Sequence, residues 1–103
     1  MATRPVNIVI NATDPPGLAR FWSVLLGWPV TFESADEVDV SASDGQGWPL
    51  DLVFVPTDIA KSGQNRVHLD LTSTSAADQA EIVERARGLG ARSIDIGQRG
   101  VPW

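Results

Sequence analysis

The chain has 103 residues, of which 43% are hydrophobic and 20% charged, so it can bury the core of one small domain and does not have the composition of a disordered protein. Its net charge of −5, with eight scattered basic residues, argues against nucleic acid and anionic membranes as partners, because both would repel it. The absence of cysteine excludes disulfides, thiolate zinc sites and cysteine nucleophiles, and the absence of a signal-peptide-like or membrane-spanning segment predicts a cytoplasmic protein.

The first half of the chain predicts a strand, a helix and three further strands. Residues 6–12 are β-branched and apolar, as in a strand. Asp14 is a suitable N-cap for the helix that follows, and Pro15 suits its first position because no N–H is needed there. Gly27 ends the helix in a left-handed cap. The apolar face of this helix comprises Leu18, Phe21, Trp22 and Leu25. The three strands are predicted over 28–34, 37–43 and 48–56, with a turn at 43–47 and a loop over 57–65.

The second half begins the same series again. Residues 66–73 predict a strand, and 74–90 a helix in which Ser75 and Asp78 have capping-box spacing. Residues 91–97 predict a strand before the chain stops. The apolar face of the helix comprises Ile82, Val83, Ala86 and Leu89.

The two halves can be aligned as an internal repeat. Asn7 aligns with His68 at an offset of 68 − 7 = 61, and Phe21 and Trp22 then fall on Ile82 and Val83. Few residues are identical, and the evidence is the shared pattern. Such a repeat predicts two copies of one supersecondary unit.

Three of the predicted strands carry a polar residue on the face opposite their stronger apolar set. Side chains alternate between the two faces of a strand, so Asn7, Asp51 and His68 lie opposite the apolar sets that pack beneath a helix. If these strands share a sheet, the three side chains point into one space. Val53 shares the face of Asp51, and Asp70 that of His68.

At these motifs the sequence resembles the vicinal oxygen chelate superfamily, which includes glyoxalase I, bleomycin-resistance proteins and extradiol dioxygenases. The resemblance is carried by "TDPPGLARFWSVLLGW", "LDLVFVP", "NRVHLDL" and "VERARGLGAR", and it is strongest to bacterial glyoxalase-like domains. It implies an α+β fold in which paired βαβββ modules form a curved, mostly antiparallel open-barrel sheet with the helices outside. The chain would be a single domain over 1–103, with module one at 5–56 and a truncated module two at 65–103.

The resemblance also implies ligand positions for a metal at Asn7, Asp51 and His68. Asparagine stands where the family has histidine, and the sequence ends before the strand that carries the fourth ligand, a glutamate. His68 and Asp51 suit one divalent ion of the Fe, Mn, Ni or Zn kind. Asn7 is a weak ligand, and functional sites usually have three protein ligands. The alternative is a ligand cleft with a polar floor and no metal.

His68 is also the candidate catalytic residue, as a proton-transfer group oriented by Asp70 or Asp51. The structural alternative is a histidine hydrogen-bonded to Asp70. Asn7, Val53, Asp70 and Trp103 are the candidate substrate-binding residues. Trp103 would stack on a flat ligand, or else be exposed or contact a second copy.

Three functions are compatible with these residues. The leading one is a glyoxalase-like domain that binds a small organic molecule in a sheet-lined cleft. The others are a metal-dependent lyase, isomerase or dioxygenase that uses Asp51 and His68, and a metal-free drug-sequestering protein. The second module has one strand after its helix where the first has three, and this leaves an unpaired edge. A longer natural chain, a partly walled cleft or a second copy would each explain this edge, and we expect a homodimer.

Overall fold

A computed structural model describes residues 3–42, 49–63 and 65–94. The chain divides into two compact units, Met1–Lys61 (unit 1) and Ser62–Trp103 (unit 2), and each is described by itself. The elements are β1 (Asn7–Ala12), α1 (Pro15–Leu26), β2 (Val30–Glu33), β3 (Val38–Val40) and β4 (Asp51–Pro56) in unit 1, and α2 (Ala76–Gly88) in unit 2. Neither α1 nor α2 is long and apolar enough to cross a membrane.

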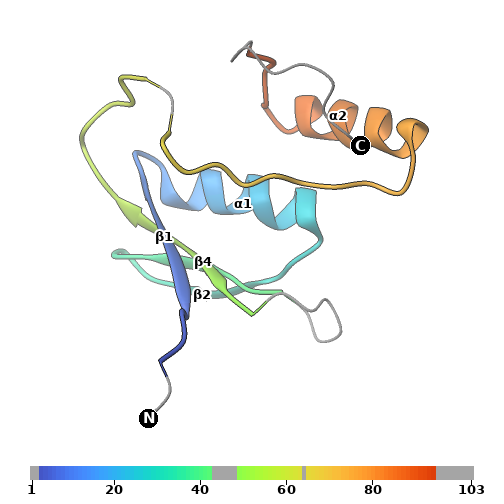
Figure 1. The fold of residues 1–103 in the computed structure, drawn as a ribbon. Helices are drawn as coiled ribbons and strands as arrows, with labels where there is room; N and C mark the ends of the chain where they lie inside the picture. Colours follow the sequence, from blue (N-terminus) through green and yellow to red (C-terminus); the bar gives the residue numbers. More distant parts are fainter. Residues whose placement is uncertain (1–2, 43–48, 64, 95–103) are drawn as a thin grey trace. The chain divides into compact units, whose positions relative to one another are not determined.

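Unit 1 contains a four-stranded mixed sheet in the order β1-β4-β3-β2 (Figure 1). β1 pairs in parallel with β4, while β4 with β3 and β3 with β2 are antiparallel. The parallel pair requires a crossover, which α1 and the two intervening strands supply. The strands predicted in the first half are confirmed, and so is the α+β class with an open sheet.

The ends of α1 form as the sequence predicts. The Asp14 side chain accepts a hydrogen bond from the Gly17 backbone N–H at 3.2 Å, and proline occupies the first turn. Gly27 has φ 72°, in the left-handed region that favours glycine, and its N–H donates to the Ser23 carbonyl at 3.0 Å. These caps satisfy backbone groups that the helix itself leaves unpaired.

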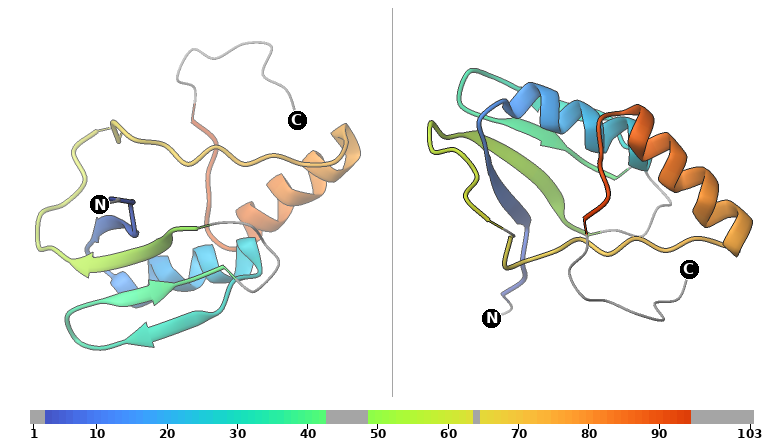
Figure 2. Two further views of the ribbon diagram at one scale, coloured as in Figure 1. Left: turned by 60° about the horizontal axis from the view of Figure 1, so that its bottom comes forward. Right: turned by 90° about the horizontal axis from the view of Figure 1, so that it is seen from above.

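The core of unit 1 lies between α1 and one face of the sheet (Figures 1 and 2). Its buried residues alternate along the strands and recur along the helix, as the patterns predict. They are Ala12, Ala19, Leu25, Val38, Val40, Leu52 and Phe54. Phe21 and Trp22, which share the predicted apolar face of α1, are not among these buried residues. Both are only half-buried, and their rings contact each other edge to face with centroids 5.2 Å apart.

Unit 2 contains α2, with its cap close to the predicted form. The Ser75 hydroxyl accepts from the Asp78 N–H at 3.1 Å. In a capping box, the Asp78 side chain would also accept from the Ser75 N–H. Here an Asp78 carboxylate oxygen accepts instead from the N–H of the preceding residue, Thr74, at 2.9 Å. No residue of α2 is buried.

The strand predicted over 66–73 is wrong, because the structure assigns no strand to these residues (Figure 1). A strand is stabilised by hydrogen bonds to a neighbouring strand, and the described residues of unit 2 contain none. Residues 91–94 are likewise not in a strand, and 95–97 lie outside the described residues. The predicted turn at 43–47 and Trp103 also lie outside them.

Candidate functional site

The sheet of unit 1 has a second face, opposite the face that packs against α1, which we call the open face. No helix of the described residues 3–42 and 49–61 covers it (Figure 2). A row of strand partners crosses its centre: Val9 on β1, Val53 on β4, Asp39 on β3 and Phe32 on β2. Strand partners have their side chains on the same face. The open face is therefore apolar along most of its central row.

Exposure varies along this central row. Val53, on an inner strand, is only 5% exposed, whereas Val9 and Phe32, on the two edge strands, are 60% and 51% exposed. Large apolar side chains that remain this accessible on one sheet face offer contact area to a ligand. The structure thus places Val53, a predicted substrate-binding residue, at the centre of the open face.

Asn7 and Asp51 form a polar row beside this centre. They are direct strand partners in the parallel pair, with Asn7 exposed and Asp51 half-buried. The alternation of the sequence predicted that both lie opposite the core, and the register brings them side by side. Their roles as metal or substrate ligands stay predictions.

The donors of the open face do not make a metal centre on their own. Asp51 supplies one carboxylate and Asn7 one neutral amide oxygen, and a divalent transition metal usually takes three protein ligands. Across the described residues of the chain, no group of three or more His, Cys, Asp or Glu side chains is suited to hold an ion.

His68 and Asp70 belong to unit 2, and both are exposed. The sequence suggested a hydrogen bond between them, either to orient a catalytic base or to satisfy the histidine. The structure shows no such bond among the interactions of the described residues. The catalytic role of His68 therefore stays a prediction, as does ligand contact by Asp70 and by Trp103.

A pair of carboxyl groups at the start of β3 was missed at the sequence level: Asp39 lies in the strand and Glu37 directly precedes it. Glu37 and Asp39 flank the buried Val38, so both point to the open face. A side-chain hydrogen bond with Asp39 raises the pKa of Glu37, and desolvation and the charges of Asp39 and Asp36 raise it further. The signal was present in "EVDV", where two acids alternate with two buried valines.

The order of elements in unit 1, its parallel first pair of strands and its open face define one βαβββ module of the glyoxalase type. The chain belongs to the glyoxalase-like domain family, whose sequence model matches residues 7–103. It is therefore a member of the vicinal oxygen chelate superfamily. No curated protein sequence matches the chain.

Among solved structures, the chain is similar to the oxidase ChaP-H2. The TM-score is 0.59 at 21% sequence identity, and the match covers 87% of this chain and 65% of the oxidase chain. The chain thus spans less than two thirds of the length of that structure. At this identity the likeness shows a shared fold.

Proposed function

We propose that the open face binds a small organic molecule that is neutral or cationic. The observation that carries this proposal is the central row, in which Val9, Val53 and Phe32 offer apolar area beside hydrogen-bonding groups. Apolar walls with a few placed polar groups are typical of small-molecule sites. Membership of the glyoxalase-like family supports binding at this face.

The charge of the open face sets the class of ligand. Its titratable groups among the described residues are Asp51 on β4, Asp39 on β3 and Glu37 directly before β3, and all three are acidic. A carboxylate ligand would be repelled there, whereas an amine or a hydrogen-bond donor would be attracted. Asn7 and Asp51, side by side at one end, would orient the polar part of the ligand.

Thermal unfolding with size-matched aromatic amines and aromatic carboxylates tests the proposal. We expect the amines to raise the unfolding temperature, since a ligand that binds the folded state stabilises it, and the carboxylates to have no effect. Val9→Lys should abolish the rise because it places a cation on the open face. Val24→Lys is the matched control, because Val24 is 46% exposed on α1. Loss of the rise in both variants, or no rise with any compound, would refute the proposal.

A metal-dependent lyase, isomerase or dioxygenase is the second candidate. The pairing of Asn7 with Asp51 favours it, because two oxygen donors on adjacent strands supply part of a ligand set. Elemental analysis of gently purified protein would then find about one transition metal per chain. His68→Ala and Asp51→Asn should each lose that metal, and a metal that stays bound in both variants would exclude these ligands.

A homodimer is our proposal for the assembly. The β1 edge of the sheet has no partner strand among the described residues, and exposed strand edges are usually covered in folded proteins. Light scattering coupled to size exclusion should give twice the mass of 11.1 kDa of one chain. A monomer mass at all concentrations would count against this proposal.

A further inference from the structure

The edge strand β1 carries two asparagines on the open face, one on each side of Val9. Asn7, Val9 and Asn11 alternate with the half-buried Ile8 and Ile10, so these three side chains point away from α1. All three are exposed. Asn7 belongs to the polar row with Asp51, whereas Asn11 lies at the opposite end of the strand.

The local structure does not explain why β1 contains two asparagines. Asparagine is depleted in strands, because its side chain competes for the backbone hydrogen bonds and favours turns. Neither Asn7 nor Asn11 forms a side-chain hydrogen bond with another described residue. Residues that disfavour the local structure without a local gain are expected at functional sites.

The two ends of β1 differ in what lies beside them on β4. Asn7 pairs with Asp51, and Asn11 pairs with the half-buried Val55. One end therefore combines an amide with a carboxylate, and the other end combines an amide with an apolar side chain. Glu37 directly precedes β3, which is two strands away from β1 in the sheet. The Asn7 end thus suits a cation, and the Asn11 end suits a neutral hydrogen-bonding group.

We propose that Asn11 holds the second end of the ligand, and that the ligand is an amine on two fused aromatic rings with a neutral polar group on the far ring. This inference rests on the proposed binding of a small organic molecule at the open face. The amine lies at Asp51 and Asn7, and the rings lie on Val9 and Val53. The amide of Asn11 offers both a donor and an acceptor, so it takes a hydroxyl or a carbonyl group.

The spacing of the two asparagines sets the length of the ligand. They are 11 − 7 = 4 residues apart, which is about 13 Å along a strand. Hydrogen bonds of about 2.9 Å at both ends leave roughly 7 Å between the two polar atoms of the ligand. Two fused aromatic rings have this length, and one ring is shorter. The exposed Val9 lies midway between the asparagines and contacts the rings.

Isothermal titration calorimetry of the whole chain tests the role of Asn11. The probes are naphthylmethylamine and the same amine with a hydroxyl group on the far ring. We expect the hydroxylated amine to bind the unaltered chain about fivefold more tightly, because it gains one hydrogen bond. In Asn11→Leu the two amines should bind with equal affinity. Asn7→Leu is the matched control, since it is the same change at the other end of β1. It should weaken both amines and keep the fivefold preference.

The outcomes separate this inference from the proposed function. Equal affinity of the two amines for the unaltered chain would overturn the role of Asn11 and leave amine binding at the open face intact. A preference that survives in Asn11→Leu, or that is lost in Asn7→Leu instead, would overturn it as well. If neither amine binds, both proposals fail. The side-chain amide signals of Asn11 in NMR should shift with the hydroxylated amine and stay unchanged with the other.

Discussion

Unit 1 and unit 2 begin with the same sequence pattern and reach different structures. The stretch that starts at Asn7 becomes β1, whereas the aligned stretch that starts at His68 is not a strand. The two helices also differ in burial: Ala19 and Leu25 of α1 are buried, whereas no residue of α2 is. Alternating apolar residues thus permit a strand, and the strand forms where a neighbour is available to pair with it.

The largest difference in stability between the units should appear when one large apolar side chain in each is truncated to alanine. Phe54 in β4 is fully buried, so Phe54→Ala should destabilise unit 1 by about 3–5 kcal/mol. Leu71→Ala is the matched change in unit 2, where Leu71 is 46% exposed, and it should cost about 0.5 kcal/mol or less. Amide hydrogen exchange in denaturant reports each unit separately. Equal losses for the two variants would contradict the contrast in burial.

A smaller contrast concerns the glycines at the ends of the two helices. Gly27 has φ 72°, so Gly27→Ala should destabilise unit 1 by about 1 kcal/mol through backbone strain. Gly88 is the last residue of α2, has no positive φ, and an added Cβ would meet no atom within 4 Å. Gly88→Ala should therefore stabilise α2, by about 0.5 kcal/mol. The two variants should change the unfolding temperature in opposite directions, and a change in the same direction would contradict the backbone conformation assigned to one of these glycines.

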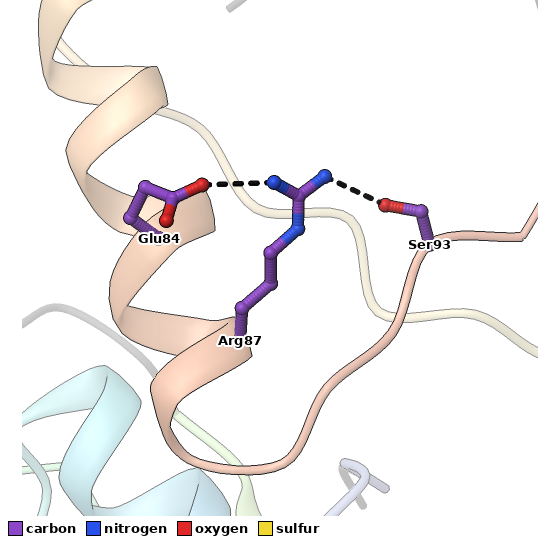
Figure 3. Close-up of polar contacts among 3 residues, drawn as sticks. All are labelled: Glu84, Arg87 and Ser93. Atoms are coloured by element: carbon purple, nitrogen blue, oxygen red, sulfur yellow. Dashed lines mark hydrogen bonds and ion pairs between the residues drawn. The ribbon is translucent and has the colours of Figure 1, made fainter.

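The smallest effect is expected at the surface of unit 2. Arg87 donates to Glu84 at 2.8 Å and to the Ser93 hydroxyl at 2.9 Å, which ties α2 to the segment after it (Figure 3). Both charged side chains are more than half exposed, so Arg87→Ala should cost about 0.3 kcal/mol at low salt and less at high salt. Ser93→Ala removes only the second bond and should show no salt dependence. An Arg87→Ala effect that is unchanged by salt would argue against the ion pair.

The sequence predicted the elements of unit 1 because each has its own local signal. Asp14, Pro15 and Gly27 mark the ends of α1, and the alternation in β1 and β4 places Asn7 and Asp51 on one face. The register that makes these two direct partners depends on contacts between distant residues, which local pattern does not contain.

The failures have physical causes of the same kind. Residues 66–73 have the alternating side chains of a strand, but a strand also needs a neighbouring strand to pair with, and the local sequence does not show whether one is present. Phe21 and Trp22 lie at helical spacing with Leu18 and Leu25, but this spacing does not show how much of the surface of α1 the sheet covers. Glu37 and Asp39 alternate with two buried valines in the sequence, but alternation alone does not show that neighbouring acids raise the pKa of Glu37.

The parallel pairing of β1 with β4 has a consequence for the order of folding. Asn7 meets Asp51 across a separation of 51 − 7 = 44 residues, and closing a loop of this length costs entropy before any pairing energy is gained. The antiparallel pairs of β2 with β3 and of β3 with β4 join segments that are adjacent in the chain. We therefore expect β1, the earliest of these four strands in the chain, to be the last to pair in the sheet.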